Sequence, residues 1–283
     1  MKLLRYVDAG KPQLGALKGQ AIVSLHRIAP QFTQIRQIAA AGPEQLAQLR
    51  VLIDKAATDL DLASVTLLAP IERPGKYLAI GLNYRDHARE AERLGMAIPK
   101  QQLWFNKQTT CICGPHDDID PGVTEKLDYE VELGVVIGKP ARHVTEANAR
   151  EHVFGYFVAN DVSARDWQLH SPTITMGKSF DTYGPIGPYI ITTEELPDPH
   201  DLAVRSFVNG ELRQHNTTRQ LIYNVWQQIA YLSTAFTLES GDLLATGTPA
   251  GVGVSMNPPS FLRRGDTVRC EIDRIGAIVN KVR

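Results

Sequence analysis

Residues 128–138 read DYEVELGVVIG, and this stretch decides the fold that we expect for the chain. Its apolar tail is typical of a buried strand, in which alternate side chains point to the same face. That spacing places Asp128, Glu130 and Glu132 together. Burying like charges side by side is unfavourable unless a cation neutralises them, which suggests a hard-metal site. For a Glu-x-Glu pair alone, an exposed strand face with solvated acids is the simpler explanation.

A further carboxylate strengthens the metal interpretation. Asp161 follows another apolar run, FGYFVANDVS at residues 154–163. Two apolar strands that each deliver a carboxylate at one end can complete an oxygen-rich shell, which suits Mg²⁺ or Mn²⁺ with water in the remaining positions. Zinc would prefer His or Cys, and neither stretch offers one.

Strand patterns dominate the chain around these two runs, with turn residues between them. Helices are few, and the clearest is expected at Thr218–Phe236, where apolar residues recur at helical spacing. The pair Asn209-Gly210 predicts a two-residue hairpin of the type I′ kind. Numerous strands with few crossover helices favour a mixed or largely antiparallel β core and an α+β fold. The remaining expected strands are KYLAIGLNY (76–84), GPIGPYIIT (184–192), GDLLATGT (241–248) and DTVRCEID (266–273).

The first 70 residues form a separate pattern. They predict two short strands, Lys2–Tyr6 and Ala21–Ser24, and a helix at Pro43–Leu60. The segment PIERPG at residues 70–75 then interrupts the chain with prolines and a glycine. We therefore expect a small N-terminal α/β domain at residues 1–70 and a catalytic domain at residues 74–283.

Composition limits the classes of partner. The chain has 30 basic and 31 acidic side chains and a formal net charge of −1, which leaves no broad basic field for nucleic acid or an anionic membrane. The N-terminal apolar run is too short for a signal peptide, and no segment approaches the roughly 20 apolar residues of a membrane span. Three cysteines form neither an even framework nor a CxxC pair, so we expect reduced, packed thiols and a cytoplasmic location.

Five motifs taken together resemble the signature series of the fumarylacetoacetate hydrolase superfamily, in the manner of an acylpyruvase-like bacterial member. In chain order they are GLNYRDHARE (81–90), DYEVELGVVIG (128–138), NDVSARDWQ (160–168), GKSFDTYGPIGP (177–188) and ATGTPAGVG (245–253). The resemblance implies a mixed β-roll catalytic core and a homodimer. It also implies that Mg²⁺, Mn²⁺ or Ca²⁺ is bound by Glu130, Glu132 and Asp161.

His87 and Glu90 are the expected acid–base pair. They lie three residues apart, so on a helical turn they share a face and Glu90 can orient His87 and raise its basicity. From the residues alone, a surface pair explains the spacing as well. The resemblance assigns the pair to a lid that closes over the substrate and activates water.

Lys178 lies between Gly177 and Ser179, where a sharp turn can present its ammonium group to the cleft. The resemblance places this lysine near the metal, where it helps to hold a developing enolate. It also assigns substrate contacts to Gln168 and Thr248.

Other polar residues have less specific roles. Tyr84 and Lys107 are expected to grip a substrate carboxylate. Arg85 and Arg165 are explained equally well as ion-pair partners of Asp86 and Asp166. Two segments depart from the family pattern, AERLGMAIPKQQ (91–102) and LHSPTITM (169–176), so the substrate cannot be transferred from a relative.

We expect a metal-dependent enzyme that hydrolyses a carbon–carbon bond in a 2,4-dioxo acid, an acylpyruvate such as maleylpyruvate or fumarylpyruvate in aromatic catabolism. Water activated by His87 would attack the distal carbonyl, and a pyruvate enolate would leave. The alternative is a decarboxylase, isomerase or hydratase of oxaloacetate or an unsaturated 2-oxo diacid at the same site. A metabolite-binding or metal-binding protein without turnover is a third possibility, which the intact acid–base set disfavours.

Overall fold

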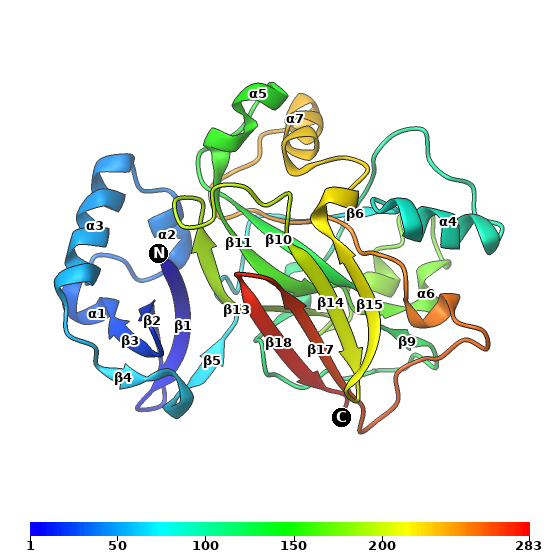
Figure 1. Cartoon of the computed structure of the whole chain (residues 1–283), viewed down its shortest axis with the longest axis horizontal. Coiled ribbons are helices and arrows are strands. Elements are labelled where there is room, and N and C mark those ends of the chain that lie inside the picture. The colour runs from blue at the N-terminus through cyan, green and yellow to red at the C-terminus, as the bar shows by residue number, and fades with distance from the viewer.

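The computed structural model describes residues 1–283, and one large mixed sheet organises them (Figure 1). Along the sheet the strands run in the order β4 (Leu60–Asp61), β3 (Ala21–Ser24), β2 (Lys11–Lys18), β1 (Lys2–Asp8), β13 (Gly184–Thr192), β11 (Val153–Asn160), β10 (Val131–Ile137), β16 (Leu243–Ala245), β6 (Tyr77–Gly81) and β7 (Leu103–Asn106). Two short strands pair off this path, β5 (Thr66–Leu68) with β1 and β8 (Ile112–Cys113) with β13. Most neighbours are antiparallel, but β16 and β6 are parallel, so the sheet is mixed and the class is α+β as expected.

Two smaller sheets complete the β structure. One is the four-stranded sheet β15 (Glu211–Thr217), β14 (Ala203–Val208), β17 (Thr267–Ile272) and β18 (Gly276–Lys281). The other is the pair β9 (Leu127–Asp128) and β12 (Ser163–Ala164). The four-stranded sheet contacts β10, β11 and β13, so the central strands of the large sheet are covered by other strands.

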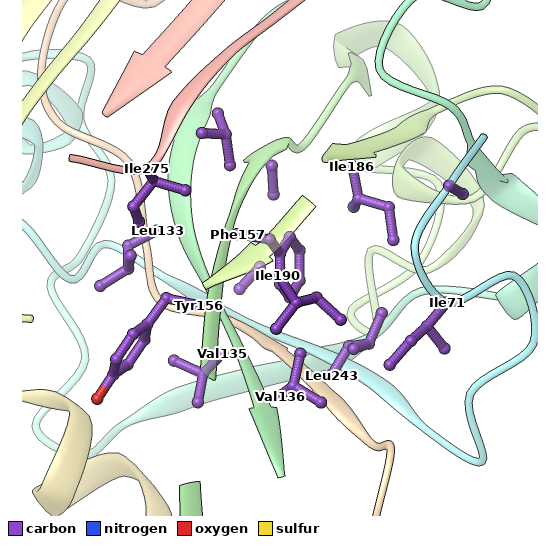
Figure 2. Packing of buried hydrophobic residues seen from close by; sticks show 14 of the residues in the cluster. Ile71, Leu133, Val135, Val136, Tyr156, Phe157, Ile186, Ile190, Leu243 and Ile275 are labelled. Atoms are coloured by element: carbon purple, nitrogen blue, oxygen red, sulfur yellow. The ribbon is translucent and has the colours of Figure 1, made fainter. Parts of the chain in front are cut away.

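The centre of the core lies on β10 and β11, in which every residue is buried. Continuous apolar sequence is what a strand covered on both faces requires. Figure 2 shows Leu133 and Val135 of β10 in one packed group with Tyr156 and Phe157 of β11 and Ile190 of β13.

The three cysteines are buried free thiols, as expected. Their positions are Cys111, Cys113 and Cys270.

Helices are short and lie outside the sheet (Figure 1). They are α1 (Leu25–Ile28), α2 (Ile35–Ala39), α3 (Pro43–Lys55), α4 (Arg85–Arg93), α5 (Glu146–Ala149), α6 (Arg165–Gln168) and α7 (Val225–Ala235). Single 3₁₀ turns occur at Leu62–Ser64, Thr109–Cys111, Arg150–His152, Met176–Lys178, Thr218–Gln220 and Gly253–Ser255. None of the helices has both the length and the apolar character that crossing a membrane requires.

The N-terminal segment joins the large sheet. β1 pairs with β13, with Lys2 opposite Ile191 and Leu3 opposite Ile190, and one apolar cluster runs from Met1 to Val282. The boundary expected between residues 70 and 74 therefore interrupts neither the sheet nor the core. In Figure 1, β1 to β4 and α1 to α3 lie at one end of the molecule and α4 and α6 at the opposite end.

Most expected elements are present, with corrected ends. The expected helix at 218–236 is wrong in its first turns, because α7 begins only after Asn224, whose side chain accepts a hydrogen bond from the N–H of Gln227 at 2.9 Å. The expected helix at 43–60 ends at Lys55, since Ala56 is extended. The Asn209-Gly210 hairpin is confirmed, with φ of 52° and 83°. Strand β2 was not predicted, because Lys11–Lys18 has no clear alternation.

Close packing of β11 on β13 depends on Gly155. A Cβ there would lie 2.3 Å from the carbonyl oxygen of Ile191, a backbone atom that cannot move cheaply. We expect Gly155→Ala to lower the free energy of unfolding by about 3 kcal/mol in urea denaturation. The control is Gly42→Ser, at a helix N-cap. A Cβ added there would have no atom within 4 Å, and serine is favoured at this position. Equal effects of the two substitutions would contradict this packing.

Candidate active site

Three buried carboxylates meet at the ends of β10 and β11. The strands pair antiparallel with Val131 opposite Asn160, so Glu130, just before β10, lies beside Asp161, just after β11. The N–H of Asp161 donates to the carbonyl oxygen of Glu130 at 2.8 Å, which fixes the two chains at this point. Glu132 adds the third carboxylate, and one ligand oxygen from each residue lies within 4.8 Å of the others. The structure thus brings together the three residues predicted to bind a metal.

Asp128 does not join this group, although the alternation in the sequence predicted that it would. It belongs to β9, which pairs with β12, so residues 128–132 do not form one continuous strand. Its carboxylate instead accepts hydrogen bonds from the N–H groups of Gly253 at 2.7 Å and Val254 at 3.0 Å. Asp128 therefore holds the loop after β16 against the site.

Three cations surround the carboxylates, the buried Lys107 and Lys178 and the partly buried Arg165. Lys178 Nζ lies 2.7 Å from Glu130 and 2.8 Å from Asp161. The Arg165 guanidinium contacts Glu130 at 2.8 Å and Asp128 at 2.8 Å. Lys107 donates to Asp161. The Asp161 carboxylate raises the pKa of Lys107, although burial alone would lower it, so this lysine remains charged.

These cations act unequally on the two glutamates. Burial alone would raise the pKa of Glu130, but the charges of Lys178 and Arg165 lower it to about 2. Glu132 contacts no cation, and its hydrogen bond comes from the N–H of Gly247 at 2.8 Å. Burial, with repulsion from Asp161 and Glu130, raises the pKa of Glu132 well above its usual value. Glu132 is thus an acid that needs a further cation.

The donor set fits a divalent metal ion. Four buried carboxylates, Asp128 included, face three cations, and the shortage of positive charge falls on Glu132. An ion bound by Glu130, Glu132 and Asp161 would remove that shortage with oxygen ligands alone, which is the preference of Mg²⁺, Mn²⁺ and Ca²⁺.

His87 and Glu90 lie on α4 with facing side chains, as their spacing predicted. His87 Nδ1 lies 3.1 Å from Glu90 Oε2, and the other oxygen of Glu90 accepts the N–H of Gly251 at 3.0 Å. When Nδ1 carries the proton and donates it in a hydrogen bond to Glu90, Nε2 is unprotonated and can accept a proton. Glu90 therefore both orients the histidine and ties α4 to the loop after β16.

Some of these side chains line one cavity of about 200 Å³. Its polar lining consists of His87, Glu130, Glu132, Arg165, Gln168, Lys178, Thr248 and Ser255. Lys178 ends a 3₁₀ turn that lies against α6, and Gly177 allows this contact because a Cβ there would lie 2.5 Å from the backbone of Gln168. Gln168 accepts from Arg165 at 3.0 Å, and Thr248 is held by Val131 and Gln214.

Two expected substrate contacts lie elsewhere. Tyr84 is fully buried and outside the cavity lining. Lys107 lies behind the carboxylates, where it donates to the carbonyl oxygens of Lys178 at 2.5 Å and Tyr183 at 3.1 Å as well as to Asp161. Both residues were predicted to line the cavity, but the fold buries them away from its surface. Neither residue is therefore positioned to grip a substrate carboxylate.

Arg165 is the site residue that sequence reasoning did not assign. It was considered as a partner of Asp166, but Asp166 binds Thr124 and the N–H of Glu125 instead. The available signal was its place four residues after Asp161, at the start of a short helix that also carries Gln168. From this position the Arg165 side chain points back toward the carboxylates at the end of β11.

Comparisons with known proteins agree on one family. The family model described as fumarylacetoacetate (FAA) hydrolase C-terminal matches residues 76–283. The mitochondrial oxaloacetate tautomerase fahd2 of Xenopus laevis is 40% identical over 290 residues, which cover all of this chain and 90% of that protein. A fumarylacetoacetate hydrolase domain-containing protein 2 homolog of Dictyostelium discoideum is 46% identical over 236 residues, 79% of this chain and 76% of that protein.

Solved structures with the same fold cover nearly the full length. Fumarylacetoacetate hydrolase from Exiguobacterium antarcticum is 35% identical with a TM-score of 0.84, over 100% of this chain and 99% of that chain. Maleylpyruvate hydrolase from Sphingobium sp. SYK-6, in complex with manganese (II) ion and pyruvate, is 29% identical with a TM-score of 0.83, over 100% and 98%.

The charge shortage at Glu132 predicts how a substitution there changes stability. Glu132→Gln removes the unpaired charge and keeps the size of the side chain. In the presence of chelator at pH 8, we expect the Tm of the variant to lie a few degrees above that of the wild type. This difference corresponds to about 1 kcal/mol or more in the free energy of unfolding. Added Mn²⁺ should raise the Tm of the wild type by mass action and leave that of the variant unchanged.

The pH dependence has a defined sign. Because the pKa of Glu132 is raised in the folded protein, the metal-free wild type should lose stability as pH rises from the usual glutamate range through that raised pKa. The variant should lack this loss. Glu151→Gln, at an exposed acid, is the control and should behave as the wild type. An equal Mn²⁺ response of wild type and Glu132→Gln would show that the metal does not bind here.

Proposed function

The chain belongs to the fumarylacetoacetate hydrolase family, and from that premise we propose that this enzyme forms and stabilises the enolate of a small 2-oxo acid at a divalent-metal centre. The observation that carries the proposal is the buried cluster of Glu130, Glu132 and Asp161, whose two glutamates line one cavity with Lys178 and His87. A relative solved with manganese and pyruvate supports both the class of metal and the class of ligand. We propose Mg²⁺ or Mn²⁺ as the ion.

Charge supports a 2-oxo acid as the ligand. With a divalent ion added, the buried carboxylates and cations of the site carry one net positive charge. A 2-oxo acid supplies one carboxylate, beside the keto group, and this neutralises the site. The enolate that follows adds a second negative charge, so the transition state needs a further donor.

Lys178 is that donor. Its ammonium group has three N–H bonds, and Glu130 and Asp161 accept two of them. The third is available to an oxygen of a ligand in the cavity that Lys178 lines. A divalent ion bound there would supply the Lewis acid that polarises the 2-oxo group.

Keto–enol tautomerisation is the reaction that we propose first. His87 Nε2 takes a proton from C3 of the 2-oxo acid, the C3–H electron pair forms the enolate, and protonation of the oxygen gives the enol. This reaction needs only a base and a group that stabilises the enolate, and His87 and Lys178 would fill these two roles. The name of the Xenopus laevis relative, oxaloacetate tautomerase, supports it.

Hydrolysis of an acylpyruvate is the second candidate, in which the His87–Glu90 pair would activate water. His87 Nε2 would take a proton from water, and the resulting hydroxide would attack the distal carbonyl. The carbon–carbon bond then breaks, its electron pair leaves as a pyruvate enolate, and the distal fragment leaves as a carboxylic acid. Maleylpyruvate and fumarylpyruvate are such substrates, and one relative is a maleylpyruvate hydrolase. Decarboxylation, isomerisation and hydration would use the same enolate.

The homodimer and the cytoplasmic location stay predictions.

His87 is expected to act as the base in either reaction. His87→Ala should lower kcat by about 10²-fold, as loss of a general base usually does. The measurement is exchange of the C3 protons of a 2-oxo acid for deuterium, together with pyruvate release from acylpyruvates, in the presence of Mn²⁺. His170→Ala is the matched control, since His170 is exposed and outside the cavity lining. Unchanged rates in His87→Ala would remove the base from both candidate reactions.

Lys178 is expected to act in the transition state. Lys178→Met keeps the approximate length of the side chain and deletes its charge, so kcat and kcat/KM should fall together, by about 10²-fold. Mn²⁺ binding should persist, because the variant retains all three carboxylates. Steady-state kinetics beside a Mn²⁺ titration test this. A raised KM with an unaltered kcat would make Lys178 a ground-state anchor instead.

A further inference from the structure

The cavity has a polar buried end and an apolar exposed end. Its charged side chains are mostly buried, with Glu132 1% and Lys178 2% exposed. Toward solvent the lining becomes apolar, and Leu94, Leu103 and Leu169 are 53%, 40% and 79% exposed. Apolar side chains of this size are favourably covered rather than left in water. The exposed end therefore offers a surface that an apolar group would cover.

Two walls form this apolar end. Leu103 and Phe105 lie two residues apart on β7, so both face the cavity, and the Phe105 ring lies 5.4 Å from Lys178 Nζ. Leu169 and Ile174 follow α6 on the other side. Phe105 thus adjoins the enolate-binding lysine, and Leu103 extends the same surface outward.

Two further apolar residues extend this lining. Leu94 and Met96 follow α4, in the segment that leads to β7, and both line the cavity. A group at the outer end would therefore contact apolar side chains from three separate segments of the chain.

The outer end contains no cation for a second carboxylate. The two cations that line the cavity, Lys178 and Arg165, already contact Glu130 and other acids at the buried end. His87 is paired with Glu90. A distal carboxylate placed against these leucines would lose part of its water and gain no cation in exchange, which is unfavourable.

We propose that the apolar end of the cavity binds the distal substituent of the 2-oxo acid, and that preferred substrates carry an alkyl or aryl group there and a single carboxylate. This inference rests on the proposed function, because that function places the carboxylate and keto group at the metal end. Among the candidate substrates above, it favours acylpyruvates with an apolar acyl group over maleylpyruvate, fumarylpyruvate and oxaloacetate, each of which carries a second carboxylate.

Two ligands of matched shape test the proposal. 5-Methyl-2-oxohexanoate carries an isopropyl group where 2-oxoglutarate carries its distal carboxylate. Calorimetric titration of the Mn²⁺-loaded protein should give a Kd at least tenfold lower for 5-methyl-2-oxohexanoate, with a negative heat-capacity change from apolar burial. Equal or tighter binding of 2-oxoglutarate would overturn the apolar subsite.

A substitution at Leu169 makes the test specific to the site. Leu169→Arg places a cation at the exposed end and should shift the ratio of the two Kd values at least tenfold toward 2-oxoglutarate. Leu52→Arg, at an exposed leucine on α3, is the control and should leave the ratio unchanged. An unchanged ratio in Leu169→Arg would overturn the proposal. If that variant altered only the sedimentation coefficient, the leucine would belong to an interface between copies of the chain.

Pyruvate separates this proposal from the one on which it rests. Pyruvate has the carboxylate and keto group and no distal substituent beyond a methyl group. If pyruvate binds with Mn²⁺ and the two matched ligands do not differ, only the apolar subsite is wrong. If no 2-oxo acid binds in the presence of Mn²⁺, the proposed function is wrong and the subsite falls with it.

Discussion

The site depends on an imbalance of buried charge. Four carboxylates lie out of water beside three cations, and the carboxylate left without a cation is Glu132. Unpaired buried charge is among the most unfavourable features that a folded protein can hold, so the arrangement is stable only if a cation binds or the acid takes up a proton. A divalent ion would resolve the imbalance and leave one positive charge, which the carboxylate of the proposed 2-oxo acid would neutralise.

The sheet explains how the carboxylates come together. β10 and β11 are buried along their whole length, and their pairing places Glu130 and Asp161 beside each other at one end. Lys178 and Lys107 then approach from other parts of the chain and are held by the same acids. A rigid sheet thus sets the metal end, whereas short helices and the segments after them form the outer wall, where sequence can vary without disturbing the core.

Local pattern predicted the part of the site that strand periodicity determines. Glu130, Glu132 and Asp161 could be predicted because each adjoins an apolar strand, and His87 and Glu90 because three residues span one helical turn. Asp128, Lys107 and Arg165 could not be placed in this way. Their positions depend on which distant segments pair, as the separate strand pair β9 and β12 and the contact of Lys107 with Asp161 show. The pairing of β1 with β13, nearly 190 residues apart along the chain, is of the same kind.

Anomalous diffraction at the manganese absorption edge, from crystals soaked in Mn²⁺, tests the central claim most directly. The charge imbalance predicts one strong anomalous peak per chain, within ligand distance of oxygens from Glu130, Glu132 and Asp161, at about 2.0–2.6 Å as hard cations bind. A peak bound by other residues, or no peak at these carboxylates in saturating Mn²⁺, would contradict it. In that case Glu132 would have to be accommodated as a protonated acid, and the enolate would depend on Lys178 alone.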